Sequence, residues 1–116
     1  MSHSKIIMPM VLAPEIEPGM AAVACAHASL AGYLQWRDEP IVAQWLSKIF
    51  YKRIYQAPTA AVWANVLTWP CALVLTESRL DNRITVVVFR PMQWSSNNEF
   101  SELPLYPART KDVHAS

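Results

Sequence analysis

The sequence predicts an α/β domain in which helices pack on a mixed four-stranded sheet, in the order β-α-α-β-α-β-β. Four short apolar runs rich in β-branched or aromatic residues are typical of strands, and the segments between them have helical spacing or an N-terminal capping residue. Breakers separate the elements. With 116 residues, 53% of them hydrophobic and 16% charged, the chain is long enough for one core and is not of disordered composition.

The first predicted strand covers residues 5–12, which are almost continuously apolar. Such a run is typical of a strand that is buried on both faces, as in parallel sheets. Pro9 interrupts this pattern because proline has no N–H to donate to a neighbouring strand. We therefore expect a bulge or an unpaired position at Pro9. Residues 13–19 are rich in breakers and predict a loop.

An alanine-rich helix is predicted from Met20 to about residue 34, and a second helix over residues 41–48. In the first helix the small residues permit close packing against a sheet. The face expected to point at the sheet carries Val23, His27, Leu30 and Leu34 at helical spacing, with Met20 and Ala24 on the same stripe.

The second half of the chain predicts three more strands and one helix. Residues 49–55 are aromatic and β-branched and indicate a strand. Thr59 is a suitable N-cap for a helix over about 60–69. Residues 72–76 and 84–89 are strands joined by a short turn-rich link, so we expect an antiparallel hairpin.

Regular periodicity ends after Pro91. We therefore expect a single domain over residues 1–116, with its core at about 5–91 and an irregular tail over 92–116.

Charge and composition limit the classes of partner. Ten Lys and Arg face nine Asp and Glu, a net charge of +1, which predicts no strong general attraction to nucleic acid or to an anionic membrane. The longest uncharged stretch, 54–76, is interrupted by two prolines and makes a poor membrane span. The N-terminus has no basic leader, so we expect a cytoplasmic protein. Two isolated cysteines, Cys25 and Cys71, indicate structural thiols, and no cofactor or metal is expected.

A few side chains could support chemistry. Gly19 precedes a helix whose free N–H groups could hold an anion. His27 is either a partly buried structural residue or a proton carrier. Glu77 and Thr85 lie along the predicted hairpin, where a carboxylate and a hydroxyl could position a water. The alternative for Glu77 is a solvated surface charge.

The segment Gly-Met-Ala-Ala-Val-Ala-Cys-Ala-His-Ala, residues 19–28, resembles the first-helix motif of type II peptidyl-tRNA hydrolases. The similarity extends more faintly over about 5–91 and includes the order of elements. It implies hydrolysis of the ester between a peptide and the 3′ end of tRNA. Thr85 matches the functional threonine of that family, Glu77 falls near its functional aspartate, and His27 matches the motif histidine; these three are the catalytic candidates.

The resemblance also implies substrate-binding residues, but the chain departs from the family pattern there. Met20 stands where the family has a catalytic lysine, and Glu-Ile-Glu-Pro at 15–18 reverses the charge of the preceding loop. The candidates for contact with substrate are Gly19, Met20, Lys52, Arg53 and Arg83.

Three interpretations follow. The chain hydrolyses peptidyl-tRNA, with Lys52, Arg53 or Arg83 replacing the lost cation. Alternatively, it has lost the activity and binds a ligand or partner, or it is an assembly protein with an aromatic dimer interface. The expected partners are tRNA and a second copy of the chain, as a homodimer.

Overall fold

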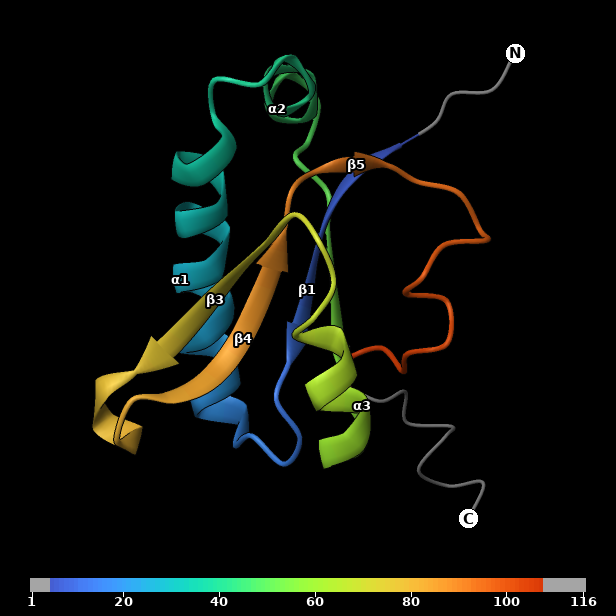
Figure 1. Ribbon diagram of the computed structural model, residues 1–116. Helices are drawn as coiled ribbons and strands as arrows, with labels where there is room; N and C mark the ends of the chain where they lie inside the picture. Colours follow the sequence, from blue (N-terminus) through green and yellow to red (C-terminus); the bar gives the residue numbers. More distant parts are fainter. Residues whose placement is uncertain (1–4, 108–116) are drawn as a thin grey trace.

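The computed structural model describes residues 5–107 (Figure 1). It confirms the α/β order β-α-α-β-α-β-β and adds a short fifth strand at the end. The elements are β1 (Ile6–Leu12), α1 (Pro18–Trp36), α2 (Pro40–Ser47), β2 (Lys52–Gln56), α3 (Ala60–Val66), β3 (Ala72–Glu77), a 3₁₀ turn (Ser78–Leu80), β4 (Arg83–Phe89) and β5 (Met92–Gln93).

The sheet is mixed, with the strand order β2-β1-β4-β3. β1 runs parallel to β2 and antiparallel to β4, and β3 and β4 form the expected antiparallel hairpin. β5 pairs with the start of β1. α1 and α3 cover opposite faces of this sheet, called here the α1 face and the α3 face (Figure 1). No helix within residues 5–107 is both long and apolar enough to cross a membrane.

Pro9 lies in the middle of β1 and is fully buried. The amide of the preceding residue, Met8, donates to Tyr51 O on the β2 side at 3.0 Å. Because successive residues of a strand direct their backbone groups to opposite sides, the nitrogen of Pro9 faces away from β2. On that side β4 pairs only with Met10–Leu12 and β5 only with Ile6 and Ile7. The predicted unpaired position is confirmed, and β1 pairs with β2 without a bulge.

α1 packs on the sheet through a different face from the one that the sequence predicted. Leu30 and Leu34 are 62% and 51% exposed, and His27 is exposed as well, so most of the expected stripe was wrong, although Ala24 on the same stripe is buried. The residues that contact the sheet are mostly small: Ala21, Ala24, Ala28, Gly32 and Trp36.

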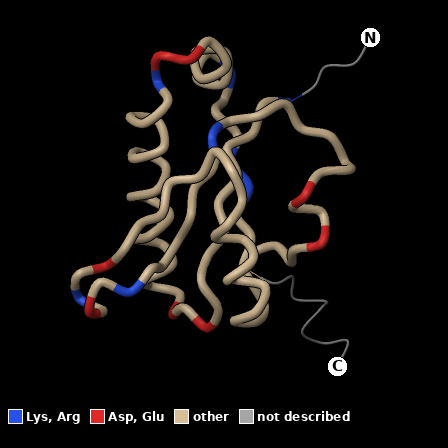
Figure 2. The backbone as a smooth tube through the Cα atoms, viewed as in Figure 1, with Lys and Arg blue, Asp and Glu red and all other residues tan. Residues whose placement is uncertain are grey.

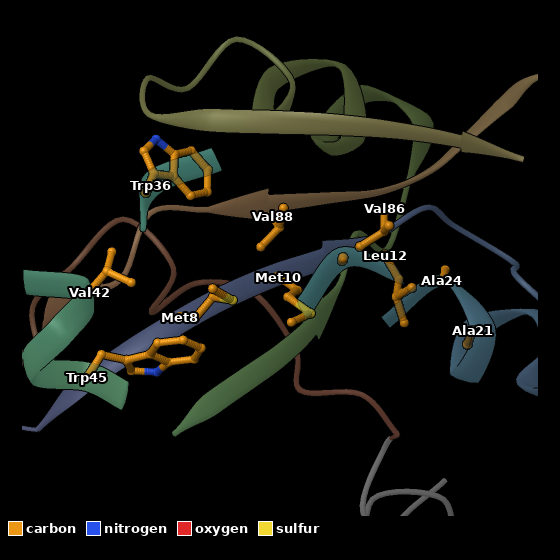
Figure 3. Packing of buried hydrophobic residues seen from close by; sticks show 11 residues of the cluster. Met8, Met10, Leu12, Ala21, Ala24, Trp36, Val42, Trp45, Val86 and Val88 are labelled. Carbon is orange, nitrogen blue, oxygen red and sulfur yellow. The ribbon is translucent and has the colours of Figure 1, made fainter. Parts of the chain in front are cut away.

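Close approach explains this choice of face. A Cβ added at Gly32 would lie 3.1 Å from side-chain carbons of both Met8 and Val88. The larger face of the helix would hold its backbone further from the sheet and leave voids. Figure 3 shows the result, in which Met8, Met10 and Val88 fill the space beneath the helices.

Several predicted boundaries shift by a few residues. β2 begins at Lys52 rather than at residue 49, and Ile49 is 62% exposed. α3 ends at Val66 rather than at about residue 69. Its predicted N-cap is confirmed, since Thr59 Oγ1 accepts a hydrogen bond from Val62 N at 3.1 Å.

The segment that follows β5 has the irregular backbone that the sequence predicted, but it packs against the sheet. It has little regular secondary structure, yet Phe100 is fully buried on the α3 face. The ring of Phe100 contacts four other aromatic rings, with centroid distances between 5.0 and 5.8 Å. Residues 108–116 of the expected tail lie outside the described residues.

Candidate functional site

A small cavity lies where β1 ends, α1 begins and β4 begins. Its volume is about 220 Å³, and it is called here the Thr85 cavity. Eight residues line it: Ala13, Glu15, Ile16, Glu17, Met20, Leu80, Arg83 and Thr85.

Thr85 is the only polar residue that is buried among residues 5–107, with 3% of its surface exposed. A β-bulge places it there. Leu75 pairs with Val86 whereas Thr76 pairs with Ile84, so Thr85 is the extra residue of β4. Bulges break the alternation of side chains along a strand and are frequent beside active sites.

The bulge reverses which face the side chains of β4 point to. Val86 and Val88 pack on the α1 face, so strict alternation would place Thr85 on the α3 face. Instead Thr85 lines the cavity beside α1, and Ile84 lines a groove beside α3. The carbonyl of Thr85 accepts a hydrogen bond from Ala13 N at 3.0 Å, which ties the bulge to the end of β1.

The charged groups of the cavity are two carboxylates and one guanidinium. Glu15 and Glu17 lie in the loop before α1, both exposed, and Glu15 has a left-handed backbone with φ of 60°. Arg83 Nη2 donates to Pro14 O at 3.2 Å, which holds the guanidinium over the same loop. Met20 lies partly buried on the cavity wall. Figure 2 shows acidic and basic residues gathered at this end of the sheet.

Glu77 lies at the end of β3, directly opposite Arg83 in the hairpin. Its Oε2 accepts hydrogen bonds from the backbone N and from Nε of Arg79, each at 3.2 Å. These bonds lower the pKa of Glu77, the backbone bond contributing most. The charge of His27 makes a smaller contribution to this pKa in the same direction.

The structure brings some of the sequence candidates together. Thr85, Arg83 and Met20 line the cavity, and Gly19 precedes Met20 at the start of α1. Glu77 and His27 do not line it, although Glu77 lies opposite Arg83, which does.

Lys52 and Arg53 lie elsewhere. Lys52 pairs with Met8 at the start of β2, whereas the cavity is at the level of Leu12, so about 13 Å of strand separates them. Lys52 Nζ lies 4.6 Å from the centre of the Phe50 ring, and burial lowers the pKa of this lysine. The Arg53 guanidinium lies over the Trp94 ring at 5.3 Å.

Sequence reasoning missed two parts of this site. Leu80 reaches the cavity from the 3₁₀ turn, and no periodic signal marks it. Ala13, directly after β1, also lines the cavity, and its N–H donates to the carbonyl of Thr85 in the bulge. Within the described residues no three His, Cys, Asp or Glu side chains are grouped as a metal site would require.

The sequence matches no protein-family model and no curated protein.

Proposed function

We propose that this chain is a peptidyl-tRNA hydrolase-like protein that binds a small amphipathic ligand in the Thr85 cavity and has lost hydrolysis of the tRNA ester. One observation carries the proposal: Met20 lines the cavity at the position where the resemblance implies a catalytic lysine. A thioether supplies neither charge nor a hydrogen-bond donor to a developing oxyanion.

The surrounding charges support loss of hydrolysis. Glu15 and Glu17 oppose the approach of phosphates, which dominate affinity for nucleic acids. Glu77 would have to act as the general base, but its carboxylate is engaged by Arg79 and its pKa is lowered, which makes it a weaker base.

The lining supports a ligand of amino-acid size. Ile16, Met20 and Leu80 offer apolar contact. The carboxylate of Glu17 suits an ammonium group, and the guanidinium of Arg83 suits a carboxylate. The buried hydroxyl of Thr85 can both donate and accept a hydrogen bond. A free amino acid with an aliphatic side chain carries all three complementary parts.

The test is a titration with leucine, followed through the methyl signals of Met20 and Thr85 by NMR. N-acetyl-leucine lacks the ammonium group and leucine methyl ester lacks the carboxylate, so both should bind more weakly. Arg83→Gln should weaken leucine binding about tenfold, since it removes a hydrogen bond between charged groups. Arg37→Gln, an exposed change beyond the end of α1, is the matched control. If none of the three compounds shifts the Met20 and Thr85 signals, the proposal is wrong.

Hydrolysis of peptidyl-tRNA is the second candidate, favoured because Thr85 and Arg83 line the cavity and Glu77 lies opposite Arg83 in the hairpin. It is tested with N-acetyl-aminoacyl-tRNA beside an active enzyme of the family. We expect no release above buffer. Turnover that disappears in Thr85→Ala and Glu77→Ala would instead establish the hydrolase and overturn the loss of activity. Arg83 is then the nearest replacement for the lost cation.

A further inference from the structure

The two edge strands of the sheet differ in whether another segment of the chain pairs with them. β2 is covered by the C-terminal segment, because Gln56 N donates to Pro104 O and Tyr106 N donates to Ile54 O. A bridge between Tyr55 and Leu105 lies between these bonds. β3, the opposite edge, has β4 on one side and no strand on the other among residues 5–107 (Figure 1).

The open side of β3 presents a regular row of backbone groups. Arg90 N donates to Cys71 O and Asn82 N donates to Glu77 O, so the odd-numbered residues direct their backbone groups toward β4. Ala72, Val74 and Thr76 therefore direct their N–H and C=O groups away from the sheet. None of these groups bonds to another described segment.

Over residues 72–76 this edge lacks the features that usually prevent strand pairing, and the charged Glu77 stands only at its end. Natural edge strands are protected by charged residues, proline or a bulge. Residues 72–76 contain no charge and no proline, and the bulge of the hairpin is in β4. Val74, at the middle, is 41% exposed. The edge is thus a template for an extended chain.

We propose that β3 pairs antiparallel with β3 of a second copy of this chain, about a two-fold axis at Val74. The axis places Ala72 opposite the partner's Thr76 and makes six N–H···O bonds from the outward-facing groups. On the α1 face Leu73 lies opposite the partner's Leu75, and both leucines are only partly buried in one copy.

Charge favours a second copy in this register. Glu77 falls opposite the partner's Cys71, so the two Glu77 carboxylates lie about 20 Å apart along the strands. No like charges face each other, and the paired region itself is uncharged. A single strand pair buries less than the roughly 1,600 Å² typical of stable complexes, so we expect a weak dimer that dissociates reversibly.

Sedimentation velocity of the full chain over micromolar concentrations tests the proposal. The weight-average sedimentation coefficient of the wild type rises with concentration, and Val74→Lys abolishes the rise. Val74 is exposed and its N–H faces outward, so the lysine variant keeps the fold. The matched control is Leu30→Lys, at an exposed position of α1, which keeps the rise.

The Leu30→Lys control also tests whether the dimer forms through a second exposed surface instead of through β3. Large apolar residues are exposed together on α1, α2 and the chain after α2: Leu30, Leu34, Leu46, Ile49, Phe50 and Tyr51. If Leu30→Lys dissociates the dimer and Val74→Lys does not, the interface is there and the proposal is wrong. A wild type that stays monomeric at every concentration also overturns it, and leaves the edge open to another chain.

Hydrogen exchange gives a second, residue-specific readout. In the dimer the amides of Val74 and Thr76 exchange more slowly as protein concentration increases. The amide of Leu75 already bonds to β4 and serves as the internal control. Exchange at Val74 that is independent of concentration, alongside a dimer in sedimentation, places the interface elsewhere and contradicts the proposal.

Discussion

The two faces of the sheet are covered by different means. On the α1 face a 19-residue helix brings its backbone close to β1 and β4 through alanine and glycine. On the α3 face the helix has seven residues and buries only Val66. Aromatic side chains complete that second layer, from β2, from β4 and from the segment after β5: Tyr55, Phe89 and Phe100, with Trp69 and Trp94 beside them.

The difference shows how loss of one side chain should act on each face. The aromatic layer depends on a few large side chains that come from segments far apart in sequence, so each carries a large share of the buried area. Between Ala21 and Gly32 the α1 face depends on the absence of side-chain bulk along the helix, and Trp36 at its end is the exception. Removing a large side chain should therefore destabilise the packing on the α3 face. Adding side-chain volume should destabilise the packing on the α1 face.

The largest effect is expected for Phe100→Ala, which removes the ring at the centre of the aromatic layer. Phe100 is fully buried, and its ring lies 5.0 Å from that of Phe89 and 5.2 Å from that of Trp69, centroid to centroid. We expect the free energy of unfolding in urea to fall by about 3–5 kcal/mol.

Phe50→Ala is the control for this prediction, because Phe50 is 47% exposed. It should cost about 1 kcal/mol or less. Equal losses in the two variants would show that the segment after β5 contributes little to the core, and the comparison of the two faces would fail.

The opposite test adds volume to α1. Gly32→Val would place side-chain atoms into Met8 and Val88, and we expect unfolding to become easier by about 1–3 kcal/mol. Gly19→Val, at the start of the same helix, meets nothing within 4 Å and should change stability by about 0.5 kcal/mol or less. A crystal structure of Gly32→Val with α1 unmoved and full stability would contradict the close-packing argument.

The sequence predicted the order of elements because breakers and β-branched runs are local signals. It could not select the buried face of α1, since that helix is apolar around most of its circumference. The face with Leu30 and Leu34 satisfies helical periodicity as well as the one with Ala28 and Gly32. Only the distance to β1 and β4 decides between them. Phe100 was missed for a related reason, because irregular chain has no period that marks a buried residue.

The site was predicted in part, for equally physical reasons. Thr85 and Met20 were found through the motif pattern, and the structure places both at one cavity. Lys52 and Arg53 were expected beside them as basic replacements for the lost cation. The register, which pairs Lys52 with Met8, puts them at the far end of the sheet, and no local pattern encodes register between distant strands. The bulge at Thr85 likewise depends on how β3 and β4 pair, so no local pattern in the sequence predicts it.

The smallest expected effect is on the stability of the protein at acid pH. We expect Glu77, at the end of β3, to contribute to it. The pKa of Glu77 is below its ordinary value of 4.5 because Arg79 donates to its carboxylate. A lowered pKa in the folded state stabilises the protein above the unfolded-state pKa, and this stabilisation is lost as pH falls through the folded value. Urea unfolding of the wild type should therefore become easier between about pH 5 and pH 3, and Glu77→Gln should flatten that dependence.

Two further variants identify the source of the effect. Arg79→Gln keeps the backbone N–H that lowers the pKa of Glu77 most, so most of the acid dependence should remain. Glu102→Gln changes an exposed carboxylate in the segment after β5, whose Phe100 and Leu103 pack on the α3 face, and should leave the wild-type profile intact. If Glu77→Gln and the wild type lose stability in parallel down to acid pH, the hydrogen bonds from Arg79 do not hold the carboxylate in solution. The two faces of the sheet would then differ in their packing but not in a stabilising contribution from the Glu77 carboxylate.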